Sequence, residues 1–405
     1  MGAGAVGIST ALHLLLRGWQ VTLIDAKLPA SETSYGNAGV ISHGSLVPLN
    51  NPDLFKSLLA YSSNLHPAVR YDIPYCIRHA AWLGRFFNQA REPHALDNAA
   101  QLHQLIQQAG AEHQHLMQLA GNAQRYRETG WLKVFREDQA NRTLDFEHRV
   151  LARHGVAMST LGVAELRDLE PSLSPIFVGG LWIKDQGSVD NPAALLREYA
   201  NYFTQSGGQF LQQKIHAILP DKSRYSVQCD DLRVEADAVV VAMGAWSKKI
   251  LQPLGYQMPL INERGYHLHF ALQEGVNISR AIHDVEGAYV MTPMEQGLRI
   301  TSGVELNRQF ARSNLAQIKL ATKRVAEAIA IRQCLDDQSW RGSRPSFADA
   351  KPVIDEAPHH KGLWFAFGHG HLGFNTGPVT GKLLAQRMSE QSPDINLQGF
   401  RATRF

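Results

Sequence analysis

The first seven residues carry a glycine pattern that is typical of the doubly wound α/β sheet. Gly2, Gly4 and Gly7 have the spacing G-x-G-x-x-G. In dinucleotide-binding units the first glycine permits a tight turn, the second lets backbone approach a pyrophosphate, and the third lets helix and strand pack closely. Residues 8–16 then place apolar side chains at helical spacing, and amides at a helix start suit phosphate groups. The pattern therefore predicts a dinucleotide site.

The residues around the turn support this prediction. An apolar strand from Val21 to Ile24 ends at Asp25, about 20 residues further on, where an acid binds a ribose hydroxyl. A glycine-rich turn without a ligand explains neither feature. A doubly wound sheet also needs a central strand before the turn, and Met1 leaves no room for one. We therefore expect the natural start to lie upstream, with an impaired nucleotide site as the alternative.

The order of the other segments predicts a discontinuous domain with a second domain inserted. Helical patterns cover Phe55 to Gln124 and Pro192 to Gln205, and short alternating segments between Gly265 and Leu306 indicate an antiparallel sheet. A second unit of strand, glycine turn and helix closes the chain. We expect an α/β fold whose Rossmann-like nucleotide-binding domain comprises 1–50, 187–250 and 338–405, with an α+β substrate domain on the antiparallel sheet, at 51–186 and 251–337.

Composition argues against several classes of protein. The net charge is only +3, and the 40 Lys and Arg residues are spread along 405 positions, so we expect no nucleic-acid partner. Cys76, Cys229 and Cys334 form no C-x-x-C pair, which argues against a thiolate metal site. No apolar run reaches the ~20 residues of a membrane span. We expect a cytoplasmic protein, and peripheral contact with the inner face of the membrane stays open.

Six segments carry the recognisable motifs of the chain. They are Gly2-Ala-Gly-Ala-Val-Gly7, Thr33-Ser-Tyr-Gly-Asn-Ala-Gly39, Val239-Val-Val-Ala-Met-Gly-Ala-Trp-Ser247, Arg264-Gly-Tyr-His267, Gly342-Ser-Arg-Pro345 and Gly368-His-Gly-His-Leu-Gly373. In this order they resemble the D-amino-acid oxidase and glycine oxidase superfamily of FAD-dependent oxidoreductases, most closely its bacterial D-amino-acid dehydrogenase branch. Met243 stands where that family has threonine.

The resemblance implies FAD as the cofactor. Related sarcosine-type oxidases attach the flavin to a cysteine, and no cysteine of this chain lies near the turn at 368–373, so non-covalent FAD is implied. The implied cofactor residues are Gly2, Gly4, Gly7, Asp25, Ser34, Asn37, Ala38, Gly39, Ile215, Ala242, Gly244, Gly370, His371, Leu372 and Gly373. For Ile215 an ordinary strand stays the alternative. His369 and His371 have H-x-H spacing, but no cysteine or carboxylate completes a ligand set, so we expect no metal.

For the substrate, the resemblance implies a small amino acid whose carboxylate binds Arg344. Arginine offers a carboxylate a planar, two-pronged partner, which lysine does not. Tyr289 resembles a substrate-side tyrosine, with an ordinary sheet tyrosine as the alternative. Tyr266 and His267 lie near the expected cavity, where they shape the substrate site or merely pack. These four residues are the candidate catalytic residues.

The implied activity is FAD-dependent oxidation of a D-amino acid or a related small amino acid. Hydride leaves the α-carbon for the flavin, and water converts the imino acid to a keto acid and ammonia. The cofactor carries this chemistry, so no dyad of catalytic side chains is required. Oxidation of secondary amines and a flavin-binding protein without catalysis stay open as alternatives. Oxygen and a quinone both stay open as the electron acceptor.

Overall fold

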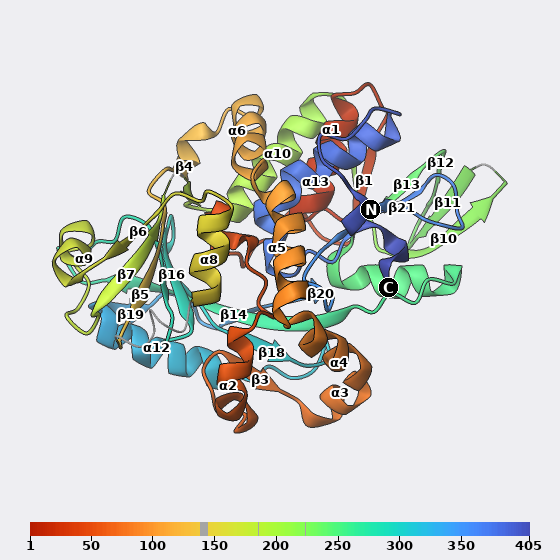
Figure 1. Ribbon diagram of the computed structural model, residues 1–405. Helices are drawn as coiled ribbons and strands as arrows, with labels where there is room; N and C mark the ends of the chain where they lie inside the picture. The colour runs from red at the N-terminus through yellow and green to blue at the C-terminus, as the bar shows by residue number, and fades with distance from the viewer. Residues whose placement is uncertain (138–144, 185, 223) are drawn as a thin grey trace.

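Helix α1 (Ala5–Leu15) directly follows the glycine turn, as predicted, and packs along α13 (Gly373–Met388) from the other end of the chain (Figure 1). The computed structural model describes residues 1–137, 145–184, 186–222 and 224–405. The two helices cross closely because α13 carries a glycine at the contact. A Cβ at Gly381 would lie 2.6 Å from the carbonyl carbon of Ser9 and from the amide nitrogen of Thr10.

Short sheets with parallel strands flank the glycine turn. β1 (Thr22–Asp25) pairs in parallel with β9 (Gln209–Gln212); β13 (Val239–Val241) pairs in parallel with β22 (Leu363–Phe367), and β21 (Val353–Glu356) pairs antiparallel with β22. Two backbone hydrogen bonds tie the turn to both sheets, from Gly2 N–H to Ile24 O at 2.8 Å and from Ala242 N–H to Met1 O at 2.9 Å. The turn therefore lies at the carboxyl ends of parallel strands, where α/β sheets bind ligands.

Two antiparallel sheets and helix α10 surround this centre. β10 (Ile215–Asp221), β11 (Arg224–Cys229) and β12 (Arg233–Ala236) form one sheet; β2 (Val40–Ile41), β8 (Gly187–Val189) and β4 (Tyr126–Arg127) form the other. α10 (Pro192–Gln205) begins as predicted, because the Asn191 side chain accepts a hydrogen bond from Ala194 N–H at 3.0 Å. Its buried face, which includes Leu196 and Phe203, shares an apolar cluster with α1.

The segments between Gly265 and Leu306 form the predicted antiparallel pairs within a larger mixed sheet. Two parallel pairings, β5 with β15 and β3 with β18, make the sheet mixed. Its strand order is β3-β18-β14-β17-β16-β15-β5-β7-β6, and β19 and β20 also pair with the long β14, which runs across the molecule (Figure 1). The strands are β3 (Val69–Tyr71), β5 (Trp131–Phe135), β6 (Met158–Leu161), β7 (Gly179–Ile183), β14 (Ile261–Leu272), β15 (Ala281–Asp284), β16 (Tyr289–Met294), β17 (Gly297–Thr301), β18 (Val304–Leu306), β19 (Ile331–Cys334) and β20 (Trp340–Ser346).

Helix α12 (Ala316–Ala328) closes one face of the large sheet. The alternation of strand side chains places Leu132 and Val134 of β5 in the same apolar cluster as Val325 of α12. Trp131 and Lys133, which alternate with them, belong to the opposite face of β5 and line a large cavity. The large sheet therefore separates an apolar core from the wall of a ligand site.

The remaining helices are α2 (Asp53–Ser62), α3 (Ile73–Arg78), α4 (Ala80–Gln89), α5 (Glu92–Ile106), α6 (Ala109–Leu119), α8 (Asp145–Arg153), α9 (Val163–Leu169) and α11 (Ser247–Leu251), with short 3₁₀ turns η1 (His43–Leu46), η2 (Ala123–Arg125), η3 (Gly244–Trp246), η4 (Gln252–Leu254), η5 (Gly370–Leu372), η6 (Gln398–Phe400) and η7 (Ala402–Arg404). The stretch predicted as helical from Phe55 to Gln124 is interrupted by β3. No helix in the described ranges is long and apolar enough to cross a membrane. The division into two domains stays a prediction, and β20 of the segment 338–405 shares backbone hydrogen bonds with β14 of 251–337.

Candidate active site

A cavity of about 880 Å³ extends from the glycine turn to the large sheet. Its walls come from the start of α1, the end of β1, the loop at 31–38, the segments at 242–250 and 366–375, and strands β5, β15 and β20. Segments that are far apart in sequence therefore meet at one site. A volume of this size is typical of pockets for small molecules and cofactors.

The three glycines of the first turn have different surroundings. Gly2 has φ +94°, a conformation that favours glycine, and a Cβ there would collide with the carbonyl oxygen of Ala242. A Cβ at Gly7 would collide with the carbonyl oxygen of Gly2. At Gly4 the nearest atom to a Cβ would be the Ser34 hydroxyl, at 3.2 Å. Gly2 and Gly7 therefore serve close packing, whereas Gly4 leaves room at the cavity wall.

Asp25 and Ser34 organise the start of α1. One carboxylate oxygen of Asp25 accepts from Ala3 N–H at 2.7 Å, and the other accepts from Lys27 N–H at 2.9 Å. The Ser34 hydroxyl accepts from Ala5 N–H at 3.0 Å. Both side chains also line the cavity. Asp25 and Ser34 therefore hold the backbone that a dinucleotide would contact. Because both side chains line the cavity, they could also contact the dinucleotide directly.

The loop at 33–39 is held from behind by Arg299 of β17. Its Nη1 donates to Tyr35 O at 2.9 Å and to Asn37 O at 2.7 Å, and its Nε donates to His269 Nε2 at 3.0 Å. Burial lowers the pKa of Arg299 to about 10, and it is only 1% exposed. The motif at 33–39 gives no indication of this anchor, because the arginine lies about 260 positions away in the sequence.

The second glycine turn places two histidines in different surroundings. His369 Nε2 contacts the Thr380 hydroxyl at 3.0 Å, and burial lowers its pKa to about 3. Burial, with smaller effects of the charges of Arg344 and Lys133, lowers the pKa of His371 to about 4. Both imidazoles are therefore neutral at pH 7. An isolated β-bridge between His369 and Ser346 brings this turn next to β20, which carries Arg344.

Most of the residues predicted for the cofactor come together along the cavity. The residues at its wall are Gly2, Gly4, Asp25, Ser34, Asn37, Ala38, Ile215, Ala242, Gly244, Gly370, His371, Leu372 and Gly373. Gly7 and Gly39 are not at the wall. A Cβ at Gly39 would lie 2.6 Å from the carbonyl oxygen of Val189, so Gly39, like Gly7, permits close packing behind the wall.

Arg344 lies at the wall of the same cavity, on β20. Its guanidinium covers Gly265, where a Cβ would lie 2.6 Å from Nη2. Glu263 stands opposite Arg344 in the register of β14 and β20. Burial lowers the pKa of Arg344, and the charge of Glu263 partly opposes this. Among the described residues, none forms a hydrogen bond or a close ion pair with the guanidinium, so its donors stay available to an anion.

Tyr289 contributes to the cavity wall, but its side chain belongs to the core behind the sheet. It is 1% exposed and packs in the cluster that contains Met291 and Leu298. Burial, and then the charge of Asp284, raises the pKa of its hydroxyl, which lies near Arg136. These contacts favour the alternative of an ordinary sheet tyrosine.

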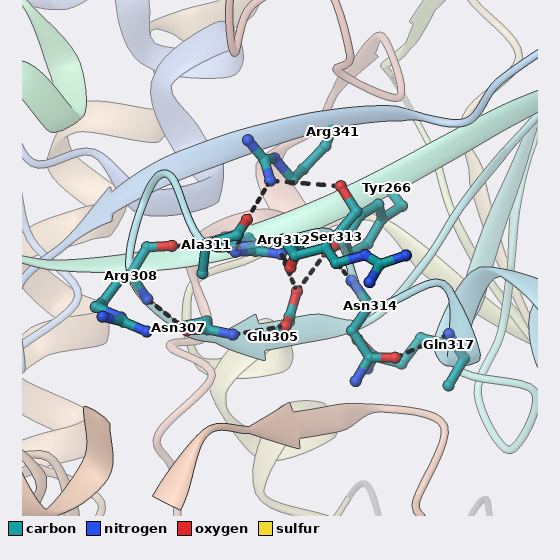
Figure 2. Close-up of polar contacts among 12 residues, drawn as sticks. Tyr266, Glu305, Asn307, Arg308, Ala311, Arg312, Ser313, Asn314, Gln317 and Arg341 are labelled. Carbon is teal, nitrogen blue, oxygen red and sulfur yellow. Dashed lines mark hydrogen bonds and ion pairs between the residues drawn. The ribbon is translucent and has the colours of Figure 1, made fainter. Parts of the chain in front are cut away.

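Tyr266 and His267 do not belong to the wall of this cavity. Figure 2 shows the Tyr266 hydroxyl directed at Glu305, to which it donates at 2.5 Å, and it accepts from Asn314 N–H at 3.1 Å. The fully buried Arg264 donates to the same hydroxyl at 2.6 Å and to carbonyl oxygens of the loop at 308–312. Tyr266 therefore stabilises this loop.

His267 packs within an aromatic cluster. Its ring stacks on Trp340 with ring centroids 4.8 Å apart, and Trp340 in turn covers Gly36 and Gly342. Burial lowers the pKa of His267 to about 2. These contacts fit the alternative in which His267 merely packs. A role of His267 in the substrate site stays a prediction.

The sequence motifs do not include three charged residues that line the cavity. They are Lys27, Lys133 and Glu147. Lys133 had a sequence signal, because it is the charged residue within the otherwise apolar strand W-L-K-V-F. Glu147 had none, since its helix shows an ordinary mixture of acidic and basic residues.

Comparisons with known proteins agree on one family. Residues 1–387 match the family model DAO, described as FAD dependent oxidoreductase. The chain is 31% identical over 421 residues to a D-amino-acid oxidase of Bradyrhizobium diazoefficiens and 25% identical over 418 residues to a D-amino acid dehydrogenase of Vibrio cholerae; each match covers 100% of this chain and 98% of the relative. Glycine oxidase from Geobacillus kaustophilus has a similar structure, with a TM-score of 0.76 at 19% identity, over 100% of this chain and 97% of that one.

Proposed function

This chain belongs to the DAO family of FAD-dependent oxidoreductases, and from that premise we propose that it oxidises a free D-amino acid, or a related small amino acid, at its Cα–N bond. The product is the imino acid, which water hydrolyses to a keto acid and ammonia. The relatives named for D-amino acids, which match the whole chain, support this substrate class.

The residues at the cavity wall fit FAD. Open space at Gly4, the amides at the start of α1 and the Asp25 carboxylate suit a pyrophosphate and a ribose. The three cysteines do not line the cavity, in keeping with non-covalent binding. When bound, the flavin supplies a hydride acceptor, and the protein contributes orientation and charge.

One observation carries the proposal: the partly buried guanidinium of Arg344 lines the cavity and forms no hydrogen bond or close ion pair with a described residue. The charge of Glu263 acts on Arg344 without a close contact, so an anionic ligand could pair with the guanidinium directly. A carboxylate matches it in charge and geometry. Arg344 would bind the α-carboxylate and thereby hold the α-carbon in one place, which is a large part of what a positioned substrate needs.

The neutral state of the nearby histidines fits the same proposal. His371 has a pKa of about 4 and His369 a pKa of about 3, so neither adds a positive charge beside Arg344 at pH 7. An amino acid could therefore bind Arg344 through its carboxylate without a competing positive charge from these histidines. If its amine enters in the neutral form, the protein needs no side-chain base. Arg344 is a substrate-binding residue in this scheme.

Anaerobic reduction of the flavin tests the proposed function. We expect D-amino acids to bleach the flavin absorbance, and L-amino acids, sarcosine and simple amines to do so much more slowly. Bleaching by sarcosine or a cyclic amine alone would contradict the proposal in favour of secondary amines. A flavin that none of these compounds reduces would contradict it altogether.

Substitution of Arg344 by lysine tests the carboxylate contact. Arg344→Lys retains the charge but loses the two-pronged geometry. A hydrogen bond to a charged group contributes ~1.5–3 kcal/mol, so kcat/KM for the amino acid should fall about ten- to a hundredfold. The matched substrate is the decarboxylated amine, whose reaction should change much less. Equal losses for both substrates would show that Arg344 is structural.

A further inference from the structure

The same cavity contains a buried ion pair that oxidation at the α-carbon does not require. Lys133 of β5 and Glu147 of α8 line the cavity, Nζ contacts Oε1, and their side chains are 9% and 8% exposed. Burial of two charges is costly, and apolar side chains of similar volume often replace such a pair without loss of stability. A charged pair at the wall of a ligand cavity therefore indicates a role in recognition.

Two polar atoms next to this pair have no hydrogen-bond partner within the described ranges. They are His283 Nδ1 and Trp131 Nε1, and both atoms are buried. His283 stands opposite Lys133 in the register of β5 and β15, and its ring stacks on Trp131 with centroids 6.3 Å apart. Both residues line the cavity. Buried polar atoms normally have partners. Trp131 Nε1 can only donate and His283 Nδ1 can donate or accept, so a polar ligand with an acceptor for the indole would complete this wall.

The ion pair and Arg344 lie in one continuous space. Both line the same cavity, as does His371, whose imidazole feels the charges of both Arg344 and Lys133. An amino acid whose carboxylate contacts Arg344 could therefore direct its side chain towards Lys133 and Glu147. The distance from Arg344 to the ion pair would select substrates by the length of their side chain. The charges of the pair would select them by the polarity of that side chain.

The charge balance of this wall favours an uncharged side chain. Lys133 and Glu147 neutralise each other, and burial, with a smaller effect of Lys133, lowers the pKa of His283 to about 3. A second carboxylate on the substrate would compete with Glu147 for Lys133 and leave a buried anion unpaired. A cationic side chain would leave Lys133 unpaired in the same way.

We propose that Lys133 and Glu147, with Trp131 and His283, form a subsite for the uncharged polar end of the substrate side chain, such as a terminal carboxamide. The amide oxygen accepts from Lys133 Nζ, and the amide nitrogen donates to the Glu147 carboxylate. This subsite rests on the proposed function, since it recognises the side chain of an amino acid held by Arg344. It makes Lys133 and Glu147 specificity-determining residues.

The first test compares substrates of equal size on the wild-type holoenzyme. The pairs are D-asparagine with D-leucine and D-glutamine with D-methionine, and the measurement is kcat/KM from anaerobic flavin reduction. For at least one pair we expect the amide to exceed its apolar partner about tenfold or more, as hydrogen bonds to charged groups allow. Apolar substrates that equal or exceed both amides would overturn the proposal.

The second test removes the pair as a unit. Lys133→Met/Glu147→Met leaves no unpaired charge behind, so the fold should persist, and the ratio of amide to apolar kcat/KM should fall about ten- to a hundredfold. The matched control is Arg149→Met/Glu92→Met, which removes an exposed pair between the same helix α8 and the start of α5 and should retain the ratio. A ratio that survives in the cavity variant would overturn the proposal.

A binding measurement separates this proposal from the proposed function. The carboxylates 4-carbamoylbutanoate and 4-(methylthio)butanoate lack the amine, so they bind without oxidation, and their affinities follow from the change in the flavin spectrum. We expect the carbamoyl compound to bind more tightly to the wild type, with the difference lost in Lys133→Met/Glu147→Met. That result would uphold the subsite even if no amino acid reduced the flavin, and equal affinities in the wild type would overturn the subsite even if D-amino acids were oxidised.

Discussion

The three glycines of the first turn differ in whether folding or ligand binding requires them. A Cβ at Gly2 or Gly7 would collide with backbone carbonyl oxygens, whereas a Cβ at Gly4 would approach only the Ser34 hydroxyl. The same glycine motif therefore contains two kinds of position. Two of them permit close packing of the backbone, and the third leaves space at the cavity wall, where we expect the cofactor to approach.

This difference predicts opposite behaviour for two variants. Gly4→Val should fold but retain little FAD, because its side chain would occupy space that a pyrophosphate needs. Gly7→Val should fold poorly, since the added carbons have no room even without ligand. The measurements are flavin absorbance per protein and the thermal midpoint of unfolding. A folded Gly4→Val protein with full flavin content would remove the cofactor assignment from this turn.

At the scale of elements, the loops of the chain depend on arginines that reach them from strands. Arg299 of β17 holds the loop at 33–39, which lines the cavity. Arg341 of β20 holds the loop at 308–314 through Ala311 O at 2.6 Å (Figure 2). The two anchors use the same chemistry, but only the first supports a loop that lines the cavity.

Arg299→Met should therefore weaken FAD binding, whereas Arg341→Met should not. Removal of Arg299 leaves the carbonyl oxygens of Tyr35 and Asn37 without this donor, and each hydrogen bond to a charged group contributes ~1.5–3 kcal/mol. We expect the Kd for FAD to rise about ten- to a hundredfold in Arg299→Met, measured by flavin fluorescence on titration of the apoprotein. Similar values of Kd in both variants would show that the loop at 33–39 does not need its anchor.

At the scale of the whole molecule, burial keeps several imidazoles neutral. Among the described histidines, it lowers the pKa furthest at six: His13, His283 and His369 to about 3, His113 and His371 to about 4, and His267 to about 2. In the unfolded chain a histidine has a pKa of about 6.5. At pH values between the folded and the unfolded pKa, these histidines are protonated in the unfolded state and neutral in the folded state.

Stability should therefore fall as the pH falls below about 6.5. The contribution of these histidines is fully present above their unfolded pKa, and it is lost progressively down to the folded pKa values of about 2 to 4. Each proton difference costs up to about 1.4 kcal/mol per pH unit. Urea unfolding of the apoprotein at pH values between 7.5 and 5 measures this loss of free energy of unfolding. Most carboxylates titrate below this interval, so they contribute little to the change. A constant free energy of unfolding over that interval would contradict the neutral, buried state of these side chains.

The sequence by itself was sufficient for features that depend on neighbours along the chain. The glycine turn, the helix after it, the helix from Pro192 to Gln205 and the alternating strands between Gly265 and Leu306 all follow from local spacing, and the structure has each of them. Their physical basis is short-range: backbone conformation, hydrogen bonds within a turn, and the period of apolar residues. The family and its cofactor followed from the same motifs, because their order in the chain is itself sequence information.

Only the tertiary structure decided which side chains reach the cavity. Tyr266 and Lys133 both lie on strands of the large sheet, yet Tyr266 stabilises a loop through Glu305 and Lys133 lines the cavity. The register of β14 against β20, and of β5 against β15, sets these directions, and a shift of one residue would turn each side chain to the other face. Such registers join segments about 80 to 150 positions apart. The pattern of residues within either strand alone does not contain them.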